Sequence, residues 1–326
     1  MNAKDIGRAR ADARSSHLGL LAEFSSALPR SEREAFCRAS RRLWPWKYFS
    51  PWREGKAPTV VFASASGRQA GSLSFIPVRM RVGRQQVRIH WIVDLIVAAR
   101  RRRSGLTGSL LVDWAQRHLK NVMTLGVTMT ARPLYSWLGF RERTGIEYWQ
   151  GSLPGAGACG TLGLQAVRVN RFPKEIDEFY LKACVAYDAS VVRDSRYLNW
   201  RYCDIPFPSG TYQKYILSDG SSLRGVLVLR ACRGGGAIKE LFVPRDDFRA
   251  LKSGLAHATR LLRELGARWV RILIDEKCPG WVAALRECGF LPSFSAPGFY
   301  FYGIEAPLEG PIHISSGDSD LDLVWM

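Results

Sequence analysis

An internal repeat constrains the fold of this chain more than any single motif does. Trp46-Lys47-Tyr48 recurs as Trp200-Arg201-Tyr202, 154 residues later, and Leu138-Gly139-Phe140 recurs as Cys288-Gly289-Phe290, 150 residues later. Because a duplicated unit repeats its landmarks in the same order and at nearly the same offset, these pairs predict two units of similar size. We expect the repeated Trp and Tyr residues to pack in the two cores.

Each unit has the same predicted succession of elements. Runs rich in Val, Ile and Phe predict strands, and apolar residues at helical spacing predict helices. The first unit has predicted strands at 59–63, 70–78, 86–97, 122–127 and 141–150, and helices at 105–120 and 133–138. The second has strands at 211–217, 224–230, 237–243, 269–274 and 299–304, and helices at 246–265 and 279–287. The pattern predicts an α+β fold in which a mixed sheet lies between helices in α/β/α layers, formed twice in tandem.

Composition changes along the chain predict the domain boundaries. We expect a first domain over 1–150, a Gly-rich linker over 151–170, a second domain over 171–305 and an acidic tail over 306–326. Asp318, Asp320 and Asp322 have the spacing of part of a calcium loop. The turn glycine and the distal glutamate of such a loop are missing, so a loose acidic tail is expected.

Charge and cysteine use limit the function classes. The formal net charge of +18 indicates an anionic partner. The sign of the charge does not distinguish a phosphorylated cofactor from nucleic acid or anionic lipid. Seven scattered cysteines without a Cys-x-x-Cys pair, and five histidines without ligand spacing, predict neither a disulfide framework nor a metal site. The charged first twenty residues lack a signal-peptide core, and no window has the roughly 18 apolar residues of a membrane span. These features predict a reduced, cytoplasmic protein.

The segment from Asp94 to Leu111 carries the strongest chemical signal. A strand ending at Val97 runs into the basic turn Arg100-Arg-Arg-Arg-Ser-Gly105, and a helix begins there. Backbone N–H groups and the positive end of the helix dipole would point at one place, and Gly105 and Gly108 would let a ligand approach the backbone. Arg side chains add donors suited to phosphate. The segment predicts an anion cradle, although it is neither a Walker loop nor a Gly-x-Gly-x-x-Gly motif.

At these residues the chain resembles the GNAT superfamily of acyltransferases. Arg102-Arg103-Ser104-Gly105-Leu106-Thr107 is similar to the family's Arg/Gln-x-x-Gly-x-Gly/Ala segment, with Thr107 where Gly or Ala is usual. Leu134-Tyr135-Ser136-Trp137-Leu138-Gly139-Phe140 is similar to the family's Leu-Tyr-x-x-x-Gly-Phe block. The resemblance implies two parallel strands that splay near Val97 and Val127 and hold acyl-coenzyme A, with acetyl-CoA the expected co-substrate and no metal.

The resemblance also implies roles for individual residues. Tyr135 matches the acid that protonates the departing thiolate, and Asp94 is the candidate base, directly or through water. His90 and Glu147 are alternative bases. Backbone N–H groups near 96–98 would polarise the thioester carbonyl. The predicted cofactor-binding residues are Leu95, Ile96, Val97, Arg102, Arg103, Ser104, Gly105, Leu106, Thr107 and Gly108.

The second unit departs from this pattern at both motifs. Its strand runs into Pro244-Arg245-Asp246-Asp247-Phe248, where two carboxylates would repel a pyrophosphate. The position of Tyr135 falls on Leu285, which has no proton to donate. We therefore expect one cofactor site, in the first unit.

Three functions stay open at this point. The first is an N-acyltransferase that moves an acetyl or other short acyl group from acyl-CoA to the primary amine of a small molecule, without a covalent enzyme intermediate. The second is an aminoacyl-tRNA-dependent peptidyltransferase. The third is a non-catalytic protein whose Arg-rich turn binds nucleic acid or another anionic partner.

Overall fold

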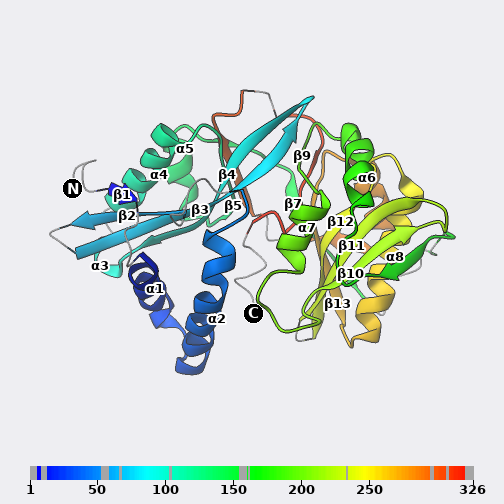
Figure 1. Cartoon of the computed structure of the whole chain (residues 1–326), viewed down its shortest axis with the longest axis horizontal. Coiled ribbons are helices and arrows are strands. Elements are labelled where there is room, and N and C mark those ends of the chain that lie inside the picture. The colour runs from blue at the N-terminus through cyan, green and yellow to red at the C-terminus, as the bar shows by residue number, and fades with distance from the viewer. Residues whose placement is uncertain are drawn as a thin grey trace. The chain divides into compact units, whose positions relative to one another are not determined.

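The structure is a computed structural model of the whole chain, and it forms two compact units (Figure 1). Unit 1 comprises Met1–Arg79, Arg88–Glu142 and Gly298–Glu305, and unit 2 comprises Met80–Val87, Arg143–Pro297 and Ala306–Met326. The residues that the structure describes are 6–8, 13–52, 59–65, 68–102, 105–153, 160, 162–232, 234–293, 297–305 and 308–319.

Unit 1 is a mixed sheet with strand order β1-β2-β3-β4-β5-β15-β6. β4 and β5 are parallel, whereas β1–β2, β2–β3, β5–β15 and β15–β6 are antiparallel. Its elements are β1 (Ile6–Arg8), α1 (Ala13–Phe24), α2 (Arg30–Tyr48), β2 (Val60–Ala65), β3 (Arg68–Val82), β4 (Gln85–Val97), α3 (Ala99–Arg102), α4 (Leu106–His118), β5 (Val122–Val127), α5 (Arg132–Trp137), β6 (Arg141–Glu142) and β15 (Gly298–Tyr302).

Alternation along β3 separates the two faces of the unit 1 sheet. Leu73 and Phe75 belong to the buried cluster that includes Leu111 of α4 and Tyr135 of α5. Ser72, which immediately precedes Leu73, instead bonds to His17 of α1. Because successive side chains of a strand point to opposite faces, α4 and α5 cover one face and α1 covers the other.

Unit 2 repeats this sheet with strand order β14-β7-β13-β12-β11-β10-β8, and its parallel pair is β12–β13. The correspondence confirms the tandem α+β fold that the repeat predicts. Trp46, Tyr48, Trp200 and Tyr202 are all buried, as expected. The elements of unit 2 are β7 (Ile146–Ser152), β8 (Gln165–Arg168), α6 (Glu175–Ala183), β9 (Ala189–Val191), α7 (Ser195–Tyr202), β10 (Gln213–Ser218), β11 (Leu223–Cys232), β12 (Gly235–Phe242), α8 (Phe248–Glu264), β13 (Trp269–Asp275), α9 (Pro279–Glu287), β14 (Phe290–Pro292) and β16 (Ile312–His313).

The two halves of the sequence exchange one strand each. The predicted strand 141–150 is in fact two strands: β6 stays in the sheet of unit 1, whereas β7 pairs with β13 and β14 of unit 2. In return, β15 pairs with β5 and β6 of unit 1. Each sheet is therefore complete only with a strand from the other half of the sequence. The predicted domain boundaries at 150 and 305 do not include this exchange.

Two further expectations differ from the structure. Asp318 is 5% exposed and its carboxylate accepts a hydrogen bond from Arg193, so this part of the predicted acidic tail is buried rather than loose. Asp320 and Asp322 lie outside the described residues. Cys288 is disulfide-bonded, which the scattered cysteine pattern did not predict.

Candidate active site

The candidate site of unit 1 lies where two parallel strands part. The last pair in register joins Ile92 of β4 to Thr124 of β5, whereas β4 continues to Val97 and β5 to Val127. Because alternate backbone groups of a strand point to each neighbouring strand, the edges that face each other beyond this pair lack a strand partner there. The predicted splay near Val97 and Val127 is confirmed, and we call this opening the fork of unit 1.

The fork begins at an irregularity in β4. Ile92 and Leu95 both pack against the cluster beneath α4, although they are three residues apart. Asp94 faces the opposite side, where its carboxylate meets Ser74. A regular strand places residues of odd separation on opposite faces, so one extra residue between Ile92 and Leu95 breaks the alternation, as in a β-bulge.

The predicted anion cradle follows β4 directly. Gly105 precedes α4 with φ of 65° and has no side chain to cap the helix. A Cβ at Gly105 would meet no atom of the described residues within 4 Å, so none of them covers the helix start on this side. The N–H groups of Leu106, Thr107 and Gly108 belong to the first helical turn, which offers them no acceptor. Such a helix start would suit an anion, and the anion cradle stays a prediction. Arg103 and Ser104 lie outside the described residues.

Thr107, the departure from the family pattern, points into the protein. It is 2% exposed, and its Cγ2 lies 3.0 Å from the place where a Cβ on Gly71 would be. The absence of a side chain on Gly71 makes room for the threonine methyl group. The Thr107 side chain therefore does not cover the outer side of the cradle, and a ligand could approach the backbone there as it could beside Gly or Ala.

Several predicted contact groups already have partners within unit 1. The Ala98 N–H donates to the Ala70 carbonyl at 2.9 Å, so the predicted polarising role is wrong for this N–H group. The Ala99 N–H donates to the Glu23 carboxylate. Arg102 lies at the surface, where its Nε donates to the Val97 carbonyl at 2.9 Å. Of the remaining predicted residues, Ile96 packs against α1, while Leu95 and Val97 are half-buried along the fork.

Asp94 is the centre of a buried polar network on the α1 side of the sheet. Its Oδ2 accepts hydrogen bonds from Lys47 at 2.7 Å, from Ser74 at 3.0 Å and from the Tyr48 hydroxyl. Burial by itself would raise the pKa of Asp94, but the Lys47 charge, His17 and these hydrogen bonds lower it to about 2. Asp94 is therefore a weaker base than an ordinary carboxylate, and its predicted role as general base stays a prediction.

The same network fixes the tautomer of His17. The Tyr48 hydroxyl gives its proton to Asp94, so it accepts from His17 Nε2, which lies 3.0 Å away. His17 Nδ1 must then accept from the Ser72 hydroxyl at 3.1 Å. Burial, opposed by Asp94 and assisted by Lys47, lowers the pKa of His17 to about 4. The ring is therefore neutral at pH 7.

Tyr135 is buried at the base of the fork on the α4 side. Its ring lies 5.1 Å from that of Phe140 and 5.7 Å from that of Tyr300. Burial raises the pKa of its phenol, against a hydrogen bond with the Thr124 side chain. The phenol is therefore protonated and held at Thr124, the residue of β5 where pairing with β4 ends. Its role as an acid stays a prediction.

Unit 2 has the same fork, but its own chain fills it. Pairing of β12 with β13 ends at Ile238–Ile272, although both strands continue. Ile312 N–H donates to Asp275 of β13 at 2.9 Å, and the His313 ring donates to the Leu241 carbonyl of β12 at 2.9 Å. An extended segment of the chain therefore bonds to both arms of this fork.

The central carboxylate is also duplicated. Asp94 follows the last parallel pair of unit 1 by two residues, and Glu240 follows that of unit 2 by two residues. Tyr48 donates to Asp94, and its repeat counterpart Tyr202 donates to Glu240 at 3.3 Å. In unit 2 the cation is Arg193, whose Nε lies 3.0 Å from Glu240.

The helix that follows the fork of unit 2 is capped by its own side chain. Asp247 accepts from the Ala250 N–H at 2.9 Å and pairs with Arg224. A carboxylate therefore occupies the helix start where the cradle of unit 1 is open, as the acidic residues predict. Leu285, at the position of Tyr135, is fully buried.

Sequence reasoning missed the basic and histidine members of these networks. It took Trp46 and Tyr48 as landmarks but gave no role to Lys47 between them, nor to His17. The signal was present, because a basic residue stands between the two aromatic residues in both copies of the repeat. Among the described residues, no three His, Cys, Asp or Glu side chains gather as metal ligands would. In the same part of the chain, no helix is both long and apolar enough to cross a bilayer.

No protein-family model matches the sequence, and no curated protein is significantly similar to it. Solved structures share its fold at low identity. A GCN5-related N-acetyltransferase from Anabaena variabilis is 13% identical with a TM-score of 0.65, over 91% of this chain and 71% of that one. The N-myristoyltransferase of Saccharomyces cerevisiae with bound myristoyl-CoA is 13% identical with a TM-score of 0.58, over 91% and 78%. Eis1 from Mycobacterium abscessus is 16% identical with a TM-score of 0.58, over 93% and 75%. These likenesses establish a tandem GNAT fold.

Proposed function

We propose that this tandem GNAT fold is an N-acyltransferase whose single active site is the fork of unit 1. The donor is acyl-CoA, and the acceptor is the primary amine of a small molecule. The observation that carries the proposal is the difference between the two forks: that of unit 2 is filled by its own chain, whereas that of unit 1 keeps open strand edges beside an uncapped helix start.

The occupant of the unit 2 fork supports the choice of an elongated ligand for the fork of unit 1. Residues 312–313 form the short strand β16, which pairs with β9 and bonds to β13 through the Ile312 N–H and to β12 through the His313 ring. The Ser315 hydroxyl donates to Glu240 of β12. The pantetheine arm of coenzyme A is also an extended chain, and it carries two amides. The open backbone edges of β4 and β5 would satisfy those amides as they would satisfy a strand.

The cradle would hold the pyrophosphate of the same ligand. The N–H groups of Leu106, Thr107 and Gly108 and the dipole of α4 favour an anion at Gly105. Arg102, exposed beside this turn, adds a positive charge. The thioester of the bound donor supplies the activated carbonyl group. The residues of the fork would orient the amine toward that group and protonate the departing sulfur.

The chemistry needs one proton removed from the amine and one supplied to the departing sulfur. Tyr135 keeps its proton and would donate it to the sulfur from its place at Thr124. Asp94, with Oδ2 engaged by Lys47, would accept a hydrogen bond from the amine at Oδ1 and so direct the nitrogen lone pair toward the carbonyl carbon. The amine then bonds to that carbon as the carbon–sulfur bond breaks, without a covalent enzyme intermediate. The sulfur takes the Tyr135 proton, and the nitrogen passes its proton to Asp94, directly or through water, and from there to solvent, which returns a proton to the Tyr135 phenolate.

Titration calorimetry with coenzyme A and acetyl-CoA on the full chain tests the proposal. We expect binding by the natural chain and at least tenfold weaker binding by Gly105→Glu, because the new carboxylate repels the pyrophosphate. Gly210→Glu is the matched control: Gly210 also has a positive φ, and a Cβ there also meets no atom within 4 Å.

Turnover supplies the second arm, measured as release of free thiol from acetyl-CoA in the presence of a panel of primary amines. Tyr135→Phe should lower kcat at least tenfold while the affinity for coenzyme A stays the same. A natural chain that binds neither coenzyme A nor acetyl-CoA would contradict the proposal.

A further inference from the structure

We infer that strand β15 limits the donor to short acyl groups by closing the base of the fork on both faces of the sheet. The inference rests on the proposed function, because it concerns the acyl end of the same ligand. A donor that lies along the open edges of β4 and β5 has its acyl group directed at the last parallel pair, Ile92 and Thr124. What stands behind that pair decides how long the acyl group can be.

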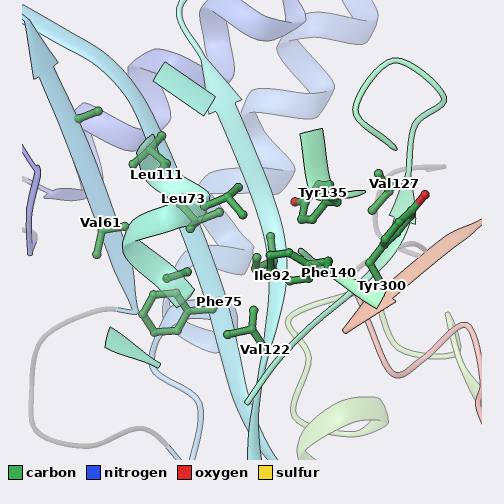
Figure 2. Packing of buried hydrophobic residues seen from close by; sticks show 13 residues of the cluster. Val61, Leu73, Phe75, Ile92, Leu111, Val122, Val127, Tyr135, Phe140 and Tyr300 are labelled. Carbon is green, nitrogen blue, oxygen red and sulfur yellow. The ribbon is translucent and has the colours of Figure 1, made fainter. Parts of the chain in front are cut away.

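On the α4 side, the base is closed by two tyrosines and Ile92. Tyr300 of β15 is directly opposite Thr124 in the antiparallel pairing of β15 with β5. Its ring lies 5.7 Å from that of Tyr135, at an interplanar angle of 31°. Figure 2 shows Tyr135, Tyr300 and Ile92 in one cluster, and all three are at most 3% exposed.

On the opposite face, a second aromatic pair closes the base. Phe299 of β15 and Trp91 of β4 are each 1% exposed, and their ring centroids are 5.8 Å apart. Trp91 immediately precedes the last parallel pair. One ring of each pair therefore comes from β15, on alternate faces of the same strand, as the strand period requires.

The rings of β15 have little freedom to move aside. Tyr300 pairs with Thr124 on one side and with Glu142 on the other, so its backbone is held between two strands. Its hydroxyl interacts with Glu142 and Ser136. Because protein interiors are close-packed and resist added volume, an acyl chain of many carbons would have to displace these rings, whereas an acetyl group would not.

The test is titration calorimetry of the full chain with coenzyme A, acetyl-CoA and octanoyl-CoA. We expect the natural chain to bind octanoyl-CoA at least tenfold more weakly than acetyl-CoA. Replacing an aromatic ring of β15 by a smaller side chain should lower the ratio of acetyl-CoA affinity to octanoyl-CoA affinity at least fivefold. The affinity for coenzyme A should stay the same. The variants are Tyr300→Ala and Phe299→Ala, with Tyr300→Leu and Phe299→Leu as smaller changes in case the alanine variants do not fold.

Tyr302→Ala is the matched control. Tyr302 lies on the same strand and face as Tyr300 but pairs with Val122, which is below the fork, so its removal should leave the ratio unchanged. If the natural chain binds coenzyme A but takes octanoyl-CoA as tightly as acetyl-CoA, or if no β15 variant changes the ratio, the limit on acyl length is refuted and the acyltransferase proposal is not. If the natural chain binds none of the three ligands, the acyltransferase proposal itself is refuted, and this inference with it.

Discussion

Each unit places a carboxylate and a tyrosine hydroxyl at the equivalent point of its own sheet, but the residues around this pair differ between the units. In unit 1, Lys47 and Tyr48 hold Asp94, and the strand edges beyond it stay open. In unit 2, Glu240 lies among Arg193, Tyr202 and Ser315, and the chain closes over it. Two parallel strands that part leave backbone groups that need partners. In unit 2, Ile312 and His313 bond to groups of both strands, whereas in unit 1 we propose that the acyl donor lies there.

The two charge networks also differ in how deeply they are buried. Arg193 bridges Glu240 and Asp318, and all three side chains are fully buried. Lys47 and Asp94 keep 8% and 15% of their side chains exposed. The unit 2 network thus serves the fold, because losing Arg193 would leave two buried carboxylates without their cation. The unit 1 network keeps contact with the place where a ligand would bind.

The largest expected effect comes from breaking the unit 2 network. Arg193→Met leaves two buried carboxylates without their cation, and we expect the free energy of opening of unit 2 to fall by about 3–5 kcal/mol. Hydrogen exchange of peptides from β12 and β13 measures this, and peptides from β4 and β5 report unit 1 separately. Lys182→Met is the control, because it removes a cation from an exposed pair with Glu178 and should have a much smaller effect. An Arg193→Met effect as small as the control would show that the network is not structural.

The next largest effect is the pH dependence of the stability of unit 1. The unfolded chain protonates His17 near pH 6.5, whereas the folded protein does so only near 4. Between these values the unfolded state binds a proton that the folded state does not, so stability present above pH 6.5 is lost as the pH falls. The loss should reach about 3 kcal/mol at pH 4.

Hydrogen exchange of β3 and β4 at several pH values between 7 and 4 measures the His17 effect. His17→Gln can keep a donor toward Tyr48 and an acceptor toward Ser72, and it should flatten the curve. His118→Gln, at the exposed end of α4, should leave the curve as it is. Asp94 contributes little in this window, because the stability it supplies is lost mainly below the unfolded pKa of 3.8, as the pH falls toward its folded pKa of about 2. An unchanged curve for His17→Gln would contradict the assignment.

The smallest expected effect sharpens the difference between the two helix starts. Asp247→Ala removes the cap of α8 and its pair with Arg224, and should lower the stability of unit 2 by about 1–2 kcal/mol. Asp246→Ala, at the exposed neighbour, should cost less than about 0.5 kcal/mol. Neither variant should change the affinity for coenzyme A, because the cradle belongs to unit 1. Urea unfolding and calorimetry measure the two quantities, and a fall in coenzyme A affinity would place the binding site elsewhere.

Much of the candidate site was predictable because it is local in sequence. A strand, a glycine with positive φ and a helix start follow one another within residues 85–118, so the cradle follows from short-range preferences. Tyr135 was predictable as a residue of a short helix before Gly139. The partners of Asp94 were not, since Lys47 and His17 lie 47 and 77 residues away in the sequence. Whether a carboxylate is a free base or half of a buried ion pair depends on such distant neighbours.

The sequence by itself determined the duplication, the order of the strands and helices in each unit, the cradle after β4 and the acidic helix start of unit 2. Only the tertiary structure decided that β7 and β15 exchange sheets, that residues 312–315 fill the fork of unit 2, and that Tyr300 and Phe299 stand at the base of the fork of unit 1. The physical reason is that periodicity encodes which face of a strand is buried. It does not encode which of several apolar strands becomes the neighbour, a choice made by packing and pairing across the whole chain.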